Sequence, residues 1–148
     1  MTRAIFQQAC VAFLNIPYLW GGDDPMQGFD CSGLAQELMA MLGLDPVGDQ
    51  TAQTLHDHFK VRSRGSHRDA GSLVFYGSSV TKITHVGVML DDTTMIEAGG
   101  GGSKTLDVTG AIRQNAYIRL RPYNARKDVV AVISPKGLPW ERIEVLLP

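Results

Sequence analysis

The stretch Phe29-Asp30-Cys31-Ser32-Gly33-Leu34 lies where a glycine-rich segment gives way to a helical pattern, and the rest of the chain is arranged around it. The residues before it, 18–28, are rich in Gly and Pro and predict a loop. After it, apolar residues recur at helical spacing until Gly43. We therefore expect a helix that begins at Cys31, with Asp30 as its N-cap, and that ends at Gly43.

The predicted helix start places Cys31 where a thiol is reactive. The unpaired N–H groups and the positive end of the helix dipole favour a negative charge in the first turn, and the thiolate is the reactive form of cysteine. Most free cysteines are small buried hydrophobes. Cys31, however, stands beside Asp and Ser and outside the apolar stripe, so we take it as a nucleophile.

The second cysteine, Cys10, falls on the apolar face of the first predicted helix. We expect it to be a buried and inert thiol. A disulfide between Cys10 and Cys31 would consume the nucleophile, and two cysteines show no disulfide framework.

Two motifs in this region resemble the signature of the NlpC-type cell-wall peptidases. Pro17-Tyr18-Leu19-Trp20-Gly21-Gly22 and the later Asp30-Cys31-Ser32-Gly33-Leu34 follow the order and separation of that family. The segment 71–76 resembles the strand before the family's catalytic histidine, and 84–90 resembles the histidine strand. The likeness covers roughly residues 5–122. Members of the family are bacterial cysteine endopeptidases with a papain-like core.

The resemblance implies an α+β fold in which N-terminal helices, with the nucleophile at a helix start, pack on an antiparallel sheet. It implies a cysteine peptidase of peptidoglycan stem peptides, cutting between D-Glu and the diamino acid through a Cys–His acyl-enzyme, with no metal or cofactor. Tyr18, Asp30 and Ser32 match residues that bind the amino end of a short peptide, although Asp and Ser are also common at helix starts. The sequence departs from the family at Gln50, where arginine is frequent, and at Glu97, where His, Asn or Gln is typical.

Composition fits one globular domain of 148 residues with its own core. We treat 1–148 as a single domain, with a core of about 5–122 and an extension, 123–148, of unassigned role. The formal net charge is −1 and no basic stripe occurs, so we expect no nucleic-acid partner.

No segment approaches the ~20 apolar residues of a membrane span, and the first residues show no signal-peptide core. Because the cell wall lies outside the cytoplasm, we expect the protein to act at the cell envelope. It would reach the wall with a signal absent from this sequence or by another route, such as assembly into a phage particle. Phage-tail proteins are then expected partners.

The remaining elements predict helices first and an antiparallel sheet afterwards, which is α+β. Helices are expected from Thr2 to about Asn15 and from Thr51 to Lys60. His56 and His58, in the latter helix, are expected to be solvated and not to share a metal. Strands are expected at 73–76, 85–90, 94–98 and 116–121, with a further strand at 129–133 and a short helix from Trp140 in the tail.

His85 is the best candidate base for the cysteine. Along its strand, Val86 and Val88 form an apolar face, so His85 and Gly87 point to the other side. Glycine at position 87 leaves room beside the imidazole for a substrate.

Hairpin geometry supplies the third group. If 91–93 is a three-residue loop, Glu97 lies on the face of His85, diagonal to it at ~7–8 Å between backbones. A carboxylate at that place would fix the imidazole tautomer and stabilise an imidazolium–thiolate pair. A loop of even length would put the two side chains on opposite faces, and Glu97 would then be a solvated hairpin residue. The polar alternatives for the third group are Asn15, Gln53 and His67.

Three other functions stay open on the sequence. One is an acyl transferase with the same Cys–His pair, and another is a non-catalytic module that binds wall or assembles into a phage tail. Intact Cys31 and His85 disfavour the second, since a binding module needs neither. A zinc site is the weakest option, because no second Cys or His lies at ligand spacing.

Overall fold

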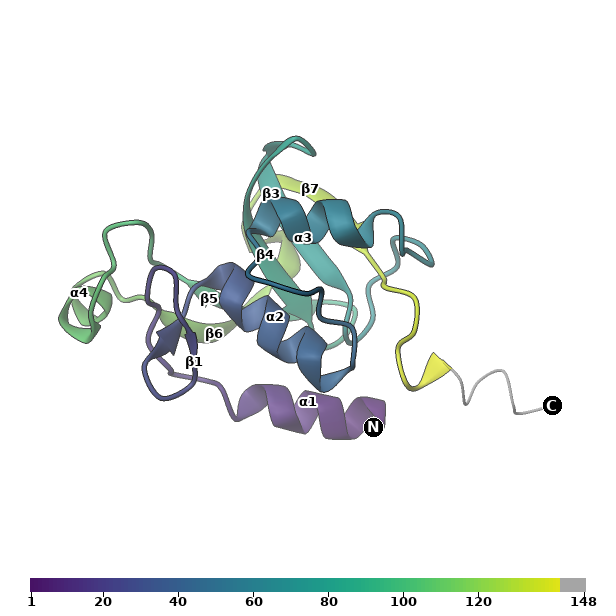
Figure 1. Cartoon of the computed structure of the whole chain (residues 1–148), viewed down its shortest axis with the longest axis horizontal. Helices are drawn as coiled ribbons and strands as arrows, with labels where there is room; N and C mark the ends of the chain where they lie inside the picture. The colour runs from purple at the N-terminus through teal and green to yellow at the C-terminus, as the bar shows by residue number, and fades with distance from the viewer. Residues whose placement is uncertain (142–148) are drawn as a thin grey trace.

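The computed structural model describes residues 1–141, which form helices packed against one sheet (Figure 1). In this part of the chain, the main sheet has five antiparallel strands in the order β6-β5-β4-β3-β7. Helices α1, α2 and α3 lie on one side of it, and α4 projects from one end of the molecule (Figure 1). The helices span Arg3–Val11 (α1), Cys31–Met41 (α2), Ala52–Phe59 (α3) and Val108–Arg113 (α4). The strands span Asp23–Asp24 (β1), Gly28–Phe29 (β2), Leu73–Ser79 (β3), Lys82–Met89 (β4), Thr94–Gly99 (β5), Tyr117–Pro122 (β6) and Val129–Ile133 (β7).

The three long helices begin where the sequence predicts. The side chains of Thr2, Asp30 and Thr51 each accept a hydrogen bond from the backbone N–H three residues later, which satisfies a donor that the helix itself leaves unpaired. The turns after α1 and α2 end at Asn15 and Gly43, both with a φ of 71°. That left-handed conformation stops a helix, and Gly and Asn adopt it most readily.

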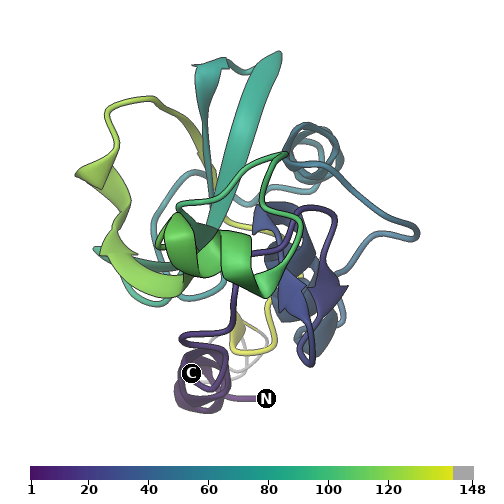
Figure 2. The same cartoon turned by 90° about the vertical axis from the view of Figure 1, so that its left-hand side faces the viewer.

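The two faces of the sheet carry different cores. Val86 and Val88 pack with the helices in the main core, whereas Met89 belongs to a smaller apolar cluster on the opposite face. The alternation predicted for this strand is therefore confirmed. His85 lies on the face of Met89, near the end of the sheet that meets the start of α2. Figure 2 shows the β3–β4 hairpin, to which His85 belongs, extending beyond the helices.

The β4–β5 hairpin has the register that the sequence predicts. Val88 lies opposite Ile96, which corresponds to a connecting loop of three residues at 91–93. The same register places Glu97 on the face of His85. A loop longer or shorter by one residue would have moved Glu97 to the other face.

The segment after β6 contributes to the core. Strand β7 pairs with β3 and confirms the additional strand that the sequence predicts. Beyond it, Leu138 and Trp140 are buried, and the Trp140 ring lies 5.5 Å from that of Phe6 in α1. Arg64 forms an ion pair with Glu141 at 2.7 Å. The short helix predicted from Trp140 falls mostly on residues 142–148, outside the described part of the chain.

The β1–β2 hairpin and α4, which begins after an Asp107 cap, are among the elements that were not expected. Both lie in segments rich in glycine, where helical and strand periodicity is weak. Among residues 1–141, no helix has the length and apolar character needed to cross a membrane.

The expectation that His56 is solvated is wrong. The side chain is 6% exposed, its ring meets that of Phe75 edge-on at 5.3 Å, and its Nδ1 lies 3.0 Å from the carboxylate of Asp57. The reason is its place on α3, four residues after buried Ala52 and three before buried Phe59, which puts it on the inner stripe of the helix. His58 is partly buried and lies off that stripe.

Candidate active site

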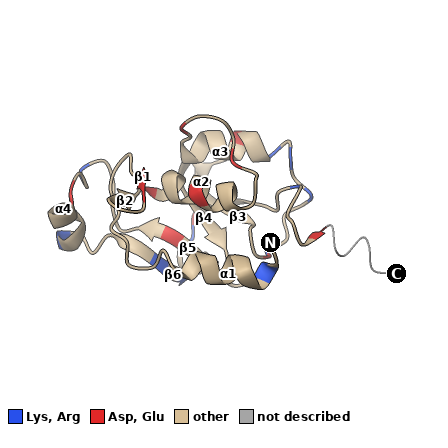
Figure 3. Ribbon diagram, turned by 60° about the horizontal axis from the view of Figure 1, so that its bottom comes forward, with Lys and Arg blue, Asp and Glu red and all other residues tan. Residues whose placement is uncertain are grey.

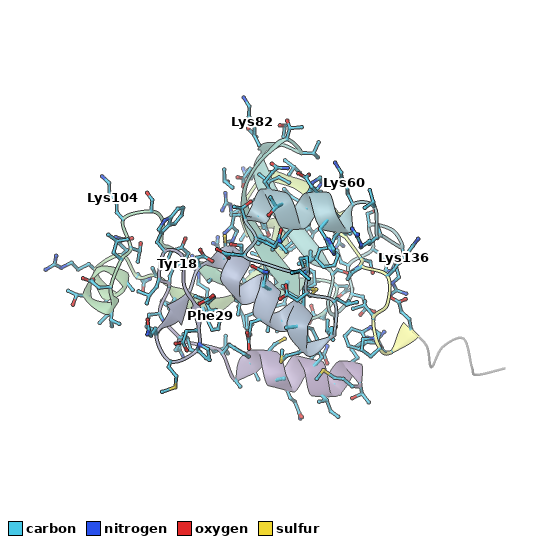
Figure 4. The ribbon with its side chains drawn as sticks, viewed as in Figure 1. Tyr18, Phe29, Lys60, Lys82, Lys104 and Lys136 are labelled. Atoms are coloured by element: carbon cyan, nitrogen blue, oxygen red, sulfur yellow. The ribbon has the colours of Figure 1, made fainter. Side chains whose placement is uncertain are left out.

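Cys31 opens α2 and borders a cleft of about 560 Å³. The same cleft is lined by Tyr18, Trp20, Asp30 and Ser32 from the loop before α2 and from its first turn. Cys31 is half-buried, so its sulfur is supported by the fold and still reached from the cleft. Figure 4 labels Tyr18 in the body of the molecule near this loop, while Lys82 and Lys104 extend from its periphery.

His85 connects Cys31 to Glu97. Its Nε2 lies 2.7 Å from Oε2 of Glu97, and the Cys31 thiol interacts with the ring and raises its pKa. Since Nε2 faces the carboxylate, Nδ1 is the nitrogen left for the sulfur. Tyr76 lies directly opposite His85 on the neighbouring strand β3. Its ring centroid is 5.5 Å from that of the imidazole, with an angle of 47° between the ring planes, and it limits the movement of the imidazole. His85 is 8% exposed and Glu97 only 1% exposed.

Opposing effects set the charges of this pair. Burial by itself lowers the pKa of His85, but the hydrogen bonds and charges of Cys31 and Glu97 outweigh it and raise that pKa to about 9. Burial likewise raises the pKa of Glu97, but the bond to His85 and the charges of His85, Arg121 and Arg119 lower it to about 2. The two groups therefore form a buried imidazolium–carboxylate pair at neutral pH.

Two arginines of β6 meet the other oxygen of Glu97. Nη1 of Arg121 lies 3.1 Å from Oε1, and Nε of Arg119 lies 3.5 Å from it. Figure 3 shows an acidic segment of β5 beside basic segments of β6. Alternation along the predicted strand 116–121 puts both arginines on one face, but nothing in the sequence connects them to Glu97. The available signal was the period-2 alternation of this strand, which becomes informative only once β6 is known to pair with β5.

Tyr18 is held in the cleft by the glycine-rich segment after β5. It is buried, and burial raises its pKa, with the nearby charges of Cys31 and Asp30 adding to the effect. Gly101 lies against the Tyr18 ring so closely that any side chain at position 101 would overlap it. The carbonyl of Thr105 accepts a hydrogen bond of 2.8 Å from the N–H of Trp20. The segment is therefore a wall of the cleft.

Asp30 has structural partners for both carboxylate oxygens. Oδ1 accepts hydrogen bonds from the N–H of Gly33 at 2.7 Å and the hydroxyl of Ser32 at 3.2 Å, and Oδ2 accepts one from the N–H of Gly21 at 3.0 Å. Burial raises its pKa against these bonds, and the charge of Asp49 adds to the rise. Asp30 thus caps α2, pins the preceding loop and still lines the cleft.

The other residues singled out in the sequence lie elsewhere or have other partners. Gln53 joins α3 to the β3–β4 hairpin through the carbonyl of Val80 and the N–H of Ile83. Asn15 and His67 are exposed. Gln50 lines the cleft, but its side-chain amide donates to carbonyls in the loop before it.

Cys10 is fully buried, and burial raises the pKa of its thiol to about 12. Both cysteines are free thiols. In residues 1–141, no cluster of three His, Cys, Asp or Glu side chains is arranged to hold a metal.

Comparison with known proteins places this geometry in context. The family model described as the NlpC/P60 family matches residues 15–122. The bifunctional muramidase/DL-endopeptidase CwlT of Bacillus subtilis is 38% identical over 94 residues, which is 62% of this chain and 28% of CwlT. The probable endopeptidase p60 of Listeria innocua is 36% identical over 103 residues, 66% of this chain and 20% of that relative. The match thus spans under a third of either relative.

Solved structures agree with the fold. The NlpC/p60 domain of the peptidoglycan hydrolase SagA has a TM-score of 0.62 at 22% identity, covering 90% of this chain and 99% of that domain. RipD of Mycobacterium tuberculosis, described as a non-catalytic NlpC/p60 domain protein adapted to peptidoglycan binding, has a TM-score of 0.61 at 18% identity, covering 90% and 98%. The predicted arrangement of helices on an antiparallel sheet is confirmed.

Proposed function

The chain belongs to the NlpC/P60 family, and from that premise we propose that it is a cysteine endopeptidase of bacterial peptidoglycan stem peptides. Cys31 is the nucleophile, His85 the general base and acid, and Glu97 the third member of the triad. The observation that carries the proposal is the connected arrangement of thiol, imidazole and carboxylate beside one cleft. The scissile bond is the one between D-Glu and the following diamino acid.

Acylation uses the pair of Cys31 and His85. His85 holds the proton of Cys31 as an imidazolium, and the Cys31 thiolate attacks the carbonyl carbon of the scissile amide. The imidazolium then protonates the leaving amine, the C–N bond breaks, and a thioester remains on Cys31. The backbone N–H of Cys31, with the Tyr18 hydroxyl near it, is suited to stabilise the oxyanion of the tetrahedral intermediate.

Deacylation needs His85 in its other protonation state. Neutral His85 takes a proton from water as the oxygen attacks the thioester carbon. The tetrahedral intermediate then expels the thiolate of Cys31 beside the protonated His85, which restores the starting ion pair, and the carboxylic acid product leaves. Glu97 holds the ring in one orientation through Nε2 during both steps.

Substrate recognition is assigned to Tyr18, Asp30 and Ser32. A carboxylate at the cleft attracts the free ammonium of an N-terminal L-Ala, and Asp49 adds a second negative charge near Asp30. The three hydrogen bonds that Asp30 already accepts hold it in place for this contact.

The test of the proposed function is turnover of a stem tripeptide that begins with L-Ala and continues through D-Glu to the diamino acid. The wild-type protein is expected to release dipeptide, identified by mass spectrometry, and Cys31→Ala to release none. N-acetylation of the tripeptide should lower kcat/KM by about 30- to 150-fold, the equivalent of about 2–3 kcal/mol for a lost charged hydrogen bond. Equal cleavage of both peptides would leave Asp30 as a helix cap and favour intact wall as the target, as a phage-borne enzyme would need.

The same assay separates the two other candidates. The likeness to RipD favours testing for a wall-binding module. Such a module would bind purified wall without releasing peptide from it. An acyl transferase would convert the tripeptide to an amide when an added amine competes with water.

A further inference from the structure

Glu97 brings a full negative charge to a position where the family pattern places a neutral amide or an imidazole. The carboxylate is 1% exposed, so solvent does not screen it. Its Oε2 bonds His85 at 2.7 Å, while Oε1 faces Arg121 at 3.1 Å and Arg119 at 3.5 Å. One carboxylate is thus shared between one imidazole and two guanidinium groups.

The fold arranges this cluster through the pairing of β5 with β6. Glu97 lies directly opposite Arg119 in the register, and Arg121 is the next residue on the same face of β6. Gly99 provides the space: a side chain there would come within 2.8 Å of Nη2 of Arg119 and 2.9 Å of Oε1 of Glu97. The side chains of Arg119 and Arg121 are 23% and 30% exposed, so both are partly removed from water.

The charge balance matters most after the thioester forms. In the free enzyme a thiolate–imidazolium pair is productive, so a carboxylate behind His85 helps. In the acyl-enzyme the thiolate is gone, and water can be activated only by neutral His85. An uncompensated buried carboxylate 2.7 Å from the ring would keep His85 protonated and stall hydrolysis at this step.

We propose that Arg121 and Arg119 are positioning residues that offset the charge of Glu97, so that His85 can lose its proton and activate water in the acyl-enzyme. The inference rests on the proposed function for its kinetic consequence, but not for its electrostatic one. Arg121 has the stronger effect, because it is nearer to Oε1.

Groups from the other neighbouring elements also lie around His85. Cys31 on α2 and Tyr76 on β3 touch or face the ring. Asp128 and Arg126, which pair with each other at 2.6 Å after β6, form a neutral unit beside Tyr76. The arginine pair of β6 is therefore the positive charge that contacts Glu97 itself.

The electrostatic test measures the His85 pKa directly, by NMR titration of histidine-labelled protein. All variants are made in a Cys31→Ala background, because this protein lacks the thiol just as the acyl-enzyme lacks the thiolate. The His85 resonance is identified as the one that disappears in His85→Gln. Arg121→Gln, which keeps a donor for Glu97 but removes the charge, is expected to raise the His85 pKa by about one unit. Arg121→Lys restores the charge and should return the pKa nearly to its starting value.

Two further variants separate this role from a structural one. Arg113→Gln, at the exposed end of α4, removes the same charge far from the cluster and should leave the His85 pKa unchanged. In a Glu97→Gln background the effect of Arg121→Gln should shrink, because the carboxylate through which it acts is gone. An unchanged or lowered pKa in Arg121→Gln would overturn the proposal.

The kinetic test uses the active protein with Cys31 present. In Arg121→Gln the acid limb of the deacylation rate should move to higher pH by the shift that NMR reports. Acid-quenched samples of Arg121→Gln, taken at about pH 6, where ordinary histidine titrates, should carry more acyl-enzyme by mass spectrometry than wild-type samples do. A normal acyl-enzyme level with a raised pKa would also overturn the proposal. If the wild type turns over no peptide, the proposed function fails, while the NMR result still decides the electrostatic effect.

Discussion

At the scale of single residues, the two cysteines of the chain lie in contrasting environments. Cys31 borders a cleft at a helix start and contacts an imidazole, whereas Cys10 has no exposed surface and sits among apolar side chains. The same side chain is thus a nucleophile candidate in one environment and a core residue in the other.

Alkylation should separate the two thiols. Iodoacetamide is expected to modify Cys31 at least about tenfold faster than Cys10 at neutral pH, since alkylation needs an accessible thiolate and burial raises the pKa of Cys10 to about 12. Peptide mapping after timed quenching gives both rates, and activity should fall with the Cys31 rate. Equal rates would remove the case for Cys31.

The charge of Glu97 should be visible in the pH dependence. The His85 pKa is raised to about 9, so the imidazolium persists below that pH and the alkaline limb of kcat/KM should fall near it. Glu97→Gln keeps the size and one acceptor but removes the charge, so the His85 pKa should drop and the alkaline limb should move down by about one pH unit. This is the opposite sign to Arg121→Gln. An unmoved limb and rate in Glu97→Gln would make Glu97 a bystander.

At the scale of elements, the cleft is made by segments that meet only in the folded chain. The start of α2 supplies the thiol, β4 the imidazole, and the segment after β5 presses on Tyr18. Asp30 ties the helix start to the glycine-rich loop, so capping and substrate contact are assigned to one carboxylate.

Two adjacent glycines provide a matched test of the cleft wall. Gly101→Ala should force Tyr18 out of place, because the added methyl would overlap its ring, whereas Gly102→Ala meets no atom within 4 Å. We expect kcat/KM to fall roughly tenfold or more for Gly101→Ala, because misplacing a group at the site slows the reaction. For Gly102→Ala, kcat/KM should stay near the wild-type value. Circular dichroism controls for folding. Equal activities would show that Tyr18 does not contribute to the site.

At the scale of the whole molecule, the sheet is completed by residues beyond the family match. The family model ends at residue 122, yet β7 covers the edge of β3 and Trp140 packs against Phe6 near the start of the chain. The two ends of the described chain therefore stabilise one core.

Removing the Trp140 side chain should test this closure. Trp140→Ala is expected to lower the free energy of unfolding by about 3–5 kcal/mol, the usual cost of deleting a buried aromatic ring, since Trp140 is 4% exposed. Val47→Ala, at a position 98% exposed, is the control and should change it little. Urea titration measures both. Activity per folded molecule should be unchanged, because Trp140 does not line the cleft.

The sequence by itself determined the helix starts, the strands of the main sheet, and the side of β4 and β5 on which His85 and Glu97 lie. These features follow from local rules: Asp30 caps because a carboxylate meets unpaired N–H groups, and side chains alternate along a strand with a period of two. The three-residue loop at 91–93 was the one condition, and the register satisfies it.

Only the tertiary structure decided what depends on segments distant in the sequence. The approach of Arg119 and Arg121 to Glu97 follows from the pairing of β6 with β5, and the burial of His56 from the packing of α3 on the sheet. The alternation of side chains along a strand assigns a residue to one face of the sheet, but it does not show which other residues pack against that face. Which strands become neighbours is set by the packing of the whole core, and that interaction is non-local, so no window of the sequence contains it.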